Sequence, residues 1–441
     1  MKTNTSADGN VHRHQSNCDG NDSDFNNWRR NTIFIGLRTN DAFGYEQTNF
    51  QPVIDLLKNT AFFVFVVSNI SLFAQVQPGA HQTDEYLPLL IGKQVGVVGN
   101  QSSLVIIDEK RIHLIDHLIE QGVDISKVFA PEHGFRGKDD AGALIDDEVN
   151  AKTGIHIVSL HGKTRKPTPK HLEDIDVLVF DIQDVGVRFF TYLSTLHLVL
   201  EACADAGVAV IVLDRPNPNA HYVDGPVMEK ENQSFLGKVP IPLVYGMTIG
   251  EYAQMLVGEQ WLDTNNSVSL QVIPVKNYNH NTLYEFPTRP SPNLPNMQSV
   301  MLYPSLGLFE GTPVNAGRGT SHPFQKFGAS FLDATHFNHQ YVPKPMPGAS
   351  NPKENGKTCY GIDLRNHPEL NRVNIDWLMQ AYAHSSQPEA FFLDPGFRRH
   401  AGTSTLATQI KNGMSESEIR ESWQSDINTF LNIRKKYLIY Q

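Results

Sequence analysis

The stretch that decides the fold is Val-Phe-Ala-Pro-Glu-His-Gly-Phe-Arg-Gly, residues 128–137, an apolar run that stops in a Pro-Glu-His-Gly turn. Residues 128–130 predict the end of a buried strand, and the Pro and Gly of residues 131–134 are typical of the sharp turn that follows. Glu132 and His133 therefore come at the carboxyl end of a strand, where open α/β sheets bind their ligands. From these ten residues alone, a solvated turn explains the two side chains equally well.

The pattern of a buried strand that ends in ionisable residues occurs twice more along the chain. Residues 176–184, Asp-Val-Leu-Val-Phe-Asp-Ile-Gln-Asp, predict a strand that ends in Asp181 and Asp184, and residues 208–215, Val-Ala-Val-Ile-Val-Leu-Asp-Arg, predict another. Helical segments separate these strands, which indicates an α/β fold with a doubly wound, mostly parallel sheet. Because the carboxyl ends of parallel strands meet at one edge, we expect these side chains to share a rim.

A second domain is expected because the chain has 441 residues and its pattern changes at Asp-Thr-Asn-Asn, residues 263–266. Residues 85–262 hold the alternating strands and helices. Residues 267–441 predict a smaller, mixed α/β domain that closes a cleft over the first. This second region contributes a Glu-Gly-Thr motif at 310–312 and a Gly-Arg-Gly-Thr motif at 317–320.

The first 74 residues differ in composition from the rest of the chain. Residues 1–57 are rich in Asn, Asp, Ser and Thr, which predicts a disordered or mis-assigned N-terminal extension. Residues 58–74 hold a lysine, an interrupted apolar run and a final alanine, the layout of a secretory signal peptide. The run is short for a membrane span, which needs about 20 apolar residues. We therefore expect an exported protein, periplasmic or secreted, without a stable membrane span after processing; a buried strand is the alternative.

Composition and missing motifs exclude several classes of function. A net charge of −10 argues against a broad nucleic-acid surface. The chain has no G-x-S-x-G, H-E-x-x-H or Walker A motif, which disfavours serine esterases, zincins and NTPases. The Ser-x-x-Lys at 350–353 contains a proline, and neither S-D-N nor K-T-G follows it, so we interpret it as a chance match. We expect neither a metal nor a cofactor, and paired carboxylates, the groups of glycoside hydrolysis, are what is left.

The second region offers one carboxylate and one cation for such a site. Glu310 follows an apolar run, and we expect burial to raise its pKa. Arg318 lies between two glycines, where it can meet a planar anion with two parallel N–H donors. A structural salt bridge or a turn would explain each residue alone, whereas the full set indicates a cleft lined by carboxylates.

Six longer motifs follow one another within residues 85–441. They are Ala-Pro-Glu-His-Gly-Phe-Arg-Gly (130–137), Asp-Ile-Gln-Asp-Val-Gly-Val-Arg (181–188) with Phe-Thr-Tyr (190–192), Asp-Arg-Pro-Asn-Pro (214–218), Tyr-Gly-Met-Thr-Ile-Gly-Glu (245–251), Ser-Pro-Asn-Leu-Pro (291–295) and Phe-Glu-Gly-Thr (309–312) with Gly-Arg-Gly-Thr (317–320). In this order they resemble the exo-β-N-acetylmuramidases, a family long known as a domain of unknown function. The resemblance does not extend to residues 1–60.

The resemblance implies a Rossmann-like catalytic domain, a second α/β domain and an active site between them. The family removes non-reducing-terminal N-acetylmuramic acid from peptidoglycan fragments during cell-wall recycling, so the implied partners are MurNAc–GlcNAc sugars. Glu132 becomes the main catalytic carboxylate because it matches the family's Pro-Glu-His-Gly motif, and His133 would orient it. Glu310 is the first choice for the second catalytic group, followed by Asp181 or Asp184.

The implied substrate makes its own demands on the site. N-acetylmuramic acid carries a lactyl carboxylate, and an acidic protein needs a local cation, Arg318 or Arg188, to accept it. Tyr192 could pack on the apolar face of the sugar, and Asn293 could bind the acetamido group. Asp184 is a further candidate for substrate binding. Retention or inversion at the anomeric carbon and the oligomeric state are left open by the sequence.

Two alternatives compete with the glycosidase. The first is a metal-dependent amidase or deacetylase acting on cell-wall material, with His133, Glu132 and Asp181 as its functional residues. The second is a non-catalytic wall-binding protein built on the same scaffold.

Overall fold

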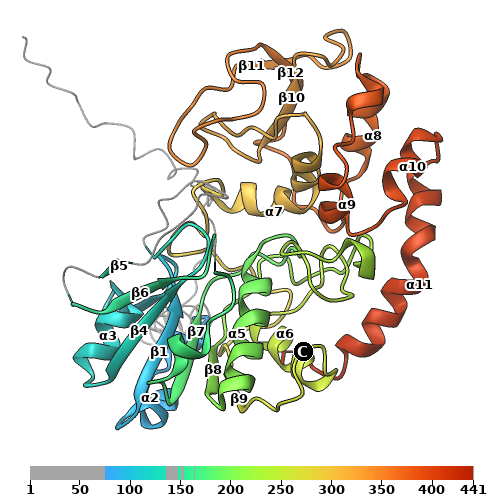
Figure 1. The fold of residues 1–441 in the computed structure, drawn as a ribbon. Helices are drawn as coiled ribbons and strands as arrows, with labels where there is room; N and C mark the ends of the chain where they lie inside the picture. Colours follow the sequence, from blue (N-terminus) through green and yellow to red (C-terminus); the bar gives the residue numbers. More distant parts are fainter. Residues whose placement is uncertain (1–74, 136–147, 150–152, 163, 441) are drawn as a thin grey trace, which may run out of the picture. The chain divides into compact units, whose positions relative to one another are not determined.

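The computed structural model describes residues 75–135, 148–149, 153–162 and 164–440 (Figure 1). The predicted N-terminal extension at 1–57 and the predicted secretory signal at 58–74 lie outside the described residues, as do Arg136 and Gly137 of the opening stretch. Within the described ranges, every helix falls short of the length or the apolar character that a membrane crossing requires.

A seven-stranded sheet organises the first part of the protein (Figure 1). Its strand order is β5-β6-β4-β1-β7-β8-β9, and every neighbouring pair is parallel except β5 with β6. The prediction of a doubly wound, mostly parallel sheet is confirmed. The strands are β1 (Gln94–Gly99), β4 (Asp124–Ala130), β5 (Glu148–Val149), β6 (His156–Ser159), β7 (Val177–Asp181), β8 (Ala209–Leu213) and β9 (Leu270–Ile273).

Helices cover both faces of this sheet, which explains the uninterrupted apolar runs in its strands. Neighbouring residues along a strand point to opposite faces, and accordingly Val179 and Phe180 belong to two different hydrophobic cores. The core around Phe180 also holds the buried faces of α5 and α6, and the core around Val179 those of α2 and α3. These helices are α2 (Thr83–Leu90), α3 (Leu114–Glu120), α5 (Tyr192–Ala206) and α6 (Ile249–Gly258).

The smaller C-terminal part is built from helices around a three-stranded antiparallel sheet of order β10-β12-β11. Its elements are α7 (Met297–Leu306), the 3-10 helix η3 (Gly307–Gly311), β10 (Lys326–Ala329), β11 (His339–Tyr341), β12 (Cys359–Asp363), α8 (Asp376–Ala383), η4 (Pro388–Ala390), α9 (Gly396–Ala401), α10 (Leu406–Lys411) and α11 (Glu416–Arg434). The remaining elements are η1 (Gly79–His81), the hairpin β2 (Leu104–Ile107) and β3 (Lys110–His113), α4 (Pro169–Leu172) and η2 (Lys230–Asn232).

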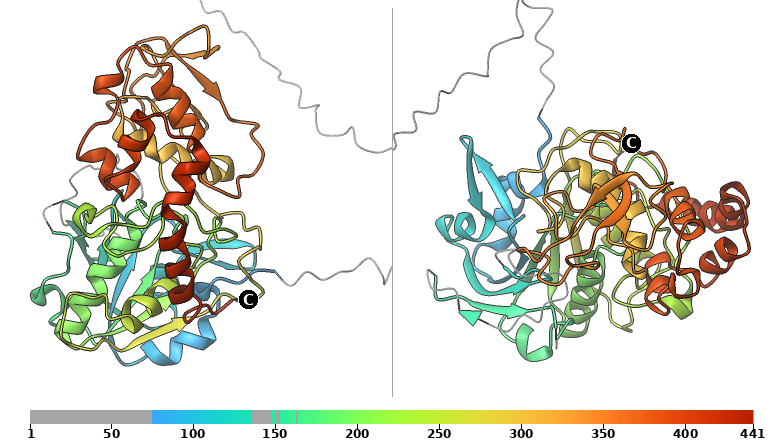
Figure 2. Two further views of the ribbon diagram at one scale, coloured as in Figure 1. Left: turned by 90° about the vertical axis from the view of Figure 1, so that its right-hand side faces the viewer. Right: turned by 90° about the horizontal axis from the view of Figure 1, so that it is seen from above.

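The last helix ties the two parts together. Figure 2 shows α11 running from the C-terminal part back along the sheet domain. Beyond it, the hydroxyl of Tyr440 donates to Asp214 at 2.5 Å, and the N–H of Ile439 donates to Glu251 at 2.8 Å. Both acceptors are completely buried. The two parts belong to one compact unit, so side chains from both can form a single site.

Residues 270–273 lie in the sheet rather than in the second part. The sequence boundary placed residues 267–441 in a second domain, but β9 pairs in parallel with β8 as the last strand of the main sheet. As an edge strand, β9 leaves Gln271 exposed while Ile273 is buried. The polar Gln271 interrupts the continuous apolar run that is typical of the central strands. The main sheet therefore continues beyond residues 263–266, where the sequence pattern placed the domain boundary.

Candidate active site

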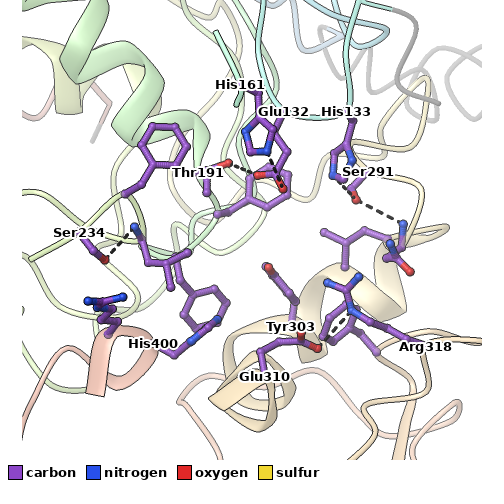
Figure 3. Close-up of a pocket in the computed structure, with 18 of the residues that line it drawn as sticks. Glu132, His133, His161, Thr191, Ser234, Ser291, Tyr303, Glu310, Arg318 and His400 are labelled. Carbon is purple, nitrogen blue, oxygen red and sulfur yellow. Dashed lines mark hydrogen bonds and ion pairs between the residues drawn. The ribbon is translucent and has the colours of Figure 1, made fainter. Parts of the chain in front are cut away.

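A cavity of about 340 Å³ lies at the carboxyl edge of the sheet, where both parts of the protein contribute to its lining. This volume falls within the range of small-molecule sites, roughly 300–1,000 Å³. Figure 3 shows Glu132, His133 and His161 approaching the cavity from one side, and Glu310 and Arg318 from the other. The structure therefore brings together five residues that lie up to 186 positions apart, from 132 to 318.

Glu132 is held in the turn that follows β4. The N–H of Gly134 closes this turn on the carbonyl oxygen of Pro131 at 3.0 Å. His133 has a φ of +70°, a left-handed conformation that costs a non-glycine residue roughly 1–3 kcal/mol and is common at functional sites. The hydroxyl of Thr191, just before α5, donates to Oε2 of Glu132 at 2.6 Å. The carboxyl group is thus fixed in position while its side chain is 16% exposed.

His161 lies beside Glu132 because β6 and β4 are neighbouring parallel strands. Its Nε2 is 4.0 Å from Oε1 of Glu132. Burial lowers the pKa of His161, and although Glu132 opposes this, the charge of Arg165 lowers it further. The imidazole is accordingly neutral at neutral pH. His161 was not predicted as a site residue, although it follows a predicted strand at the same edge of the sheet.

His133 points toward the second part of the protein. Its Nε2 is 3.1 Å from the hydroxyl of Ser291, and the residue is 5% exposed. The contact connects the Pro-Glu-His-Gly turn with the Ser-Pro-Asn-Leu-Pro loop. Asn293 in that loop also lines the cavity, and its amide donates to the carbonyl oxygen of Gly348 at 2.7 Å. Part of its hydrogen-bonding capacity therefore holds the loop itself.

Glu310 and Arg318 form an ion pair on the opposite wall. Nε of Arg318 donates to Oε1 of Glu310 at 3.2 Å, and the guanidinium lies 5.1 Å from the centroid of the Phe324 ring. Burial alone would raise the pKa of Glu310, but the charges of Arg318 and Lys353 outweigh it and hold the pKa below its ordinary value. The expected rise is therefore wrong in direction, because the apolar run before Glu310 gives no sign of the cations that fold against it.

Lys353 supports this wall from behind. Its ammonium group donates to three backbone carbonyl oxygens around η3. The acceptors belong to Phe309 (2.9 Å), Glu310 (3.0 Å) and Thr312 (2.7 Å). The lysine of the Ser-x-x-Lys stretch thus fixes the backbone that carries Glu310.

Two predicted carboxylates lie outside the cavity lining. Asp181 is completely buried, and Arg215 donates to both of its oxygens, at 2.6 and 2.9 Å. Asp184 accepts hydrogen bonds from the Tyr245 hydroxyl at 2.5 Å and the Gly186 N–H at 2.6 Å, and burial raises its pKa to about 6. The structure does not bring Asp181 to Glu132 and His133, as the metal-dependent alternative requires. Among the described residues, no group of three or more His, Cys, Asp or Glu side chains is placed to hold a metal ion.

Arg188 and Tyr192, both predicted to bind substrate, are 1% exposed and outside the cavity lining. The Tyr192 hydroxyl accepts a hydrogen bond from the amide of Asn100 at 2.9 Å. The guanidinium of Arg188 donates to four backbone carbonyl oxygens. They belong to Pro226 (2.7 Å), Ile241 (2.9 Å), His400 (3.2 Å) and Ala401 (2.7 Å). Arg188 therefore connects loops of the sheet domain to α9, next to the cavity.

Several residues that line the cavity were not identified from the sequence. They are Arg165, Thr191, Phe235, Tyr303, Arg399 and His400, in addition to His161. Thr191 is the central residue of the Phe-Thr-Tyr motif, of which only Tyr192 was predicted to bind substrate. The others carry no motif that the sequence analysis used. Tyr303, Arg399 and His400 lie on α7 and α9, Phe235 lies in the 234–236 loop, and Arg165 lies between β6 and α4.

Comparisons with known proteins agree along almost the whole described chain. Residues 95–298 match the model of the N-terminal part, and residues 301–440 that of the C-terminal part, of the family described as exo-beta-N-acetylmuramidase NamZ. The peptidoglycan beta-N-acetylmuramidase NamZ of Bacillus subtilis (strain 168) is 36% identical over 376 residues, which cover 81% of this chain and 89% of that protein.

Two solved structures of DUF1343 family proteins from Bacteroides fragilis share this fold. One has a TM-score of 0.76 and 40% identity, the other a TM-score of 0.71 and 29% identity. Each comparison covers 83% of this chain and 99% of the solved one. From the two family models and the identity to the Bacillus protein, we conclude that the chain belongs to the exo-β-N-acetylmuramidase NamZ family, a family of glycosidases.

Proposed function

We propose that this protein is an exo-acting glycoside hydrolase that releases non-reducing-terminal N-acetylmuramic acid from peptidoglycan fragments. The observation that carries the proposal is the pair of glutamates, Glu132 and Glu310, on opposite walls of one cavity in a member of this family. Glycoside hydrolysis uses two carboxyl groups that flank the scissile bond. The substrate of the Bacillus relative, named for peptidoglycan, supports the choice of polymer.

The two glutamates suit different roles. Arg318 and Lys353 favour the ionised form of Glu310, so Glu310 suits the group that stays charged, as base, nucleophile or electrostatic stabiliser. Glu132 is then the proton donor to the leaving oxygen, held in place by Thr191 and next to the neutral His161. Both assignments follow from the rule that the environments of the two carboxyl groups must differ.

The test is to identify the products from a defined disaccharide. Purified protein incubated with MurNAc–GlcNAc is expected to yield free N-acetylmuramic acid and N-acetylglucosamine in equal amounts, measured by liquid chromatography and mass spectrometry. The reversed disaccharide GlcNAc–MurNAc should stay intact, because an exo-enzyme of this type needs the muramic residue at the non-reducing end. Release of acetate or of an amino acid from wall fragments would instead support the deacetylase or amidase, and binding without turnover the wall-binding protein.

Removing the cation beside Glu310 should change the pH dependence. Because Arg318 lowers the pKa of Glu310, the Arg318→Gln variant should have a higher Glu310 pKa, and Glu310 would be protonated sooner as the pH falls. The acidic limb of the kcat/KM profile should therefore move to higher pH. An acidic limb that stays in place while activity drops at all pH values would show that Arg318 acts without tuning Glu310.

A further inference from the structure

The cavity is locally cationic in a protein that is acidic overall. Three arginines, Arg165, Arg318 and Arg399, and two glutamates line it, whereas the whole chain has a net charge of −10. Burial lowers the pKa of both His161 and His400, so these imidazoles add little positive charge at neutral pH. Even with both glutamates ionised, one guanidinium charge is in excess, and this favours a ligand that brings its own anionic group.

Arg318 is not the free cation, because it is paired with Glu310. Its guanidinium also rests near the Phe324 ring, which limits its movement. A substrate carboxylate bound to Arg318 would compete with Glu310 for the guanidinium, which keeps Glu310 ionised. We therefore expect a substrate anion to bind another cation of the cavity.

The guanidinium of Arg165 is positioned to bind a substrate carboxylate. Its guanidinium lies 4.4 Å from the centroid of the Phe235 ring, and both residues line the cavity. Stacking of this kind restrains the guanidinium plane while the N–H donors along its edge can still reach a carboxylate. In the part of the chain that the structure describes, no carboxylate forms an ion pair with Arg165, and its side chain is exposed.

Arg165 also lies on the Glu132 side of the cavity. The Phe235 ring on which it stacks lies 6.4 Å, centroid to centroid, from the ring of His161, and His161 in turn lies 4.0 Å from Glu132. In N-acetylmuramic acid the lactyl group is attached two ring atoms from the anomeric carbon. A receptor for its carboxylate must therefore line the same cavity as the catalytic carboxyl groups, as Arg165 does.

We propose that Arg165, stacked on Phe235, binds the lactyl carboxylate of the terminal N-acetylmuramic acid residue. The inference rests on the proposed function and adds a selectivity to it. A lactyl group that is joined to a stem peptide is an amide and carries no charge at this position. The enzyme therefore favours fragments whose terminal lactyl group is a free acid, after the peptide has been removed by an amide-cleaving reaction.

Arg399 is the matched comparison for Arg165. It lines the same cavity, and no carboxylate of the described residues forms an ion pair with it. It is carried by α9 of the C-terminal part, whereas Arg165 follows β6 of the main sheet. Arg165→Gln and Arg399→Gln each remove one positive charge from the cavity. Only Arg165→Gln removes the proposed contact with the lactyl carboxylate.

The experiment compares two substrates that differ in one charge, 4-nitrophenyl β-N-acetylmuramide and its lactyl carboxamide. Wild-type protein should have a kcat/KM about tenfold higher for the acid, the lower end for hydrogen bonds to a charged group, because Arg165 is solvent-exposed. In Arg165→Gln this preference should disappear through a higher KM for the acid. Arg399→Gln should keep the preference, and Phe235→Leu should reduce it because Arg165 loses its support.

Each contrary outcome has a distinct meaning. Equal kcat/KM values of the wild-type protein for acid and amide would overturn the inference and leave the glycosidase intact. If the preference for the acid substrate survived in Arg165→Gln and vanished in Arg399→Gln, the inference would be overturned, and Arg399 would be the residue that binds the lactyl carboxylate. Failure to cleave either substrate or MurNAc–GlcNAc would instead defeat the proposed function. An unchanged midpoint of urea unfolding in each variant verifies that the fold is preserved.

Discussion

Replacing Glu132 by glutamine is expected to lower kcat for release of N-acetylmuramic acid from MurNAc–GlcNAc by about a thousandfold, within the range known for a lost general acid. Glutamine keeps the shape of the side chain, and its amide oxygen can still accept the hydrogen bond from Thr191. It cannot transfer a proton to the leaving oxygen. Initial rates measured over a range of substrate concentrations should show the loss in kcat, with little change in KM.

The matched control is Glu120→Gln, the same substitution at an exposed position at the end of α3. It should leave both kcat and KM at the wild-type values. Wild-type turnover by the Glu132→Gln variant would remove Glu132 from the mechanism. The family assignment would stand in that case, since it rests on matches over residues 95–298 and 301–440.

Arg188 is expected to contribute to the stability of the fold and not to the chemical step. Arg188→Met is expected to cost about 3–5 kcal/mol in the free energy of unfolding, because it leaves three buried carbonyl oxygens and one partly buried carbonyl oxygen without their donor. Two of these carbonyls belong to α9 and two to loops of the sheet domain. The substitution thus loosens the connection beside the cavity. Urea unfolding followed by tryptophan fluorescence measures the loss.

Arg372→Met is the control for this prediction. Its side chain is 59% exposed and 3.8 Å from Glu416, so its loss should change the free energy of unfolding by no more than about 0.5 kcal/mol. The result also separates two roles for Arg188. If Arg188 contacted substrate, as its motif suggested, Arg188→Met would raise KM and keep the wild-type unfolding midpoint.

The main features of the fold and one wall of the site were predictable from the sequence. A strand that is covered on both faces must be apolar throughout, and a turn with Pro and Gly marks where it stops. These two local patterns identify β4 and β7 and place Glu132 at the sheet edge. The edge strand β9 was not assigned to the sheet because the exposed Gln271 interrupts its apolar run.

The distinction between Glu132 and Asp181 shows what the tertiary structure alone decides. Both are carboxylates at the ends of buried strands in the same sheet. Arg215 occupies both oxygens of Asp181, whereas a hydroxyl from the start of α5 holds Glu132 open to the cavity. Neither partner is encoded in the local pattern around the carboxylate, because long-range packing selects it.

The sequence by itself determined the parallel sheet, the position of Glu132 and the family, since these depend on periodicity and on contiguous motifs. The tertiary structure decided that Glu310 is ionised by Arg318, that Arg188 is a structural connection and that Arg165 faces the cavity. Such properties arise from charges and donors that are distant in the chain and adjacent in space, and hydrophobic patterns carry no information about them.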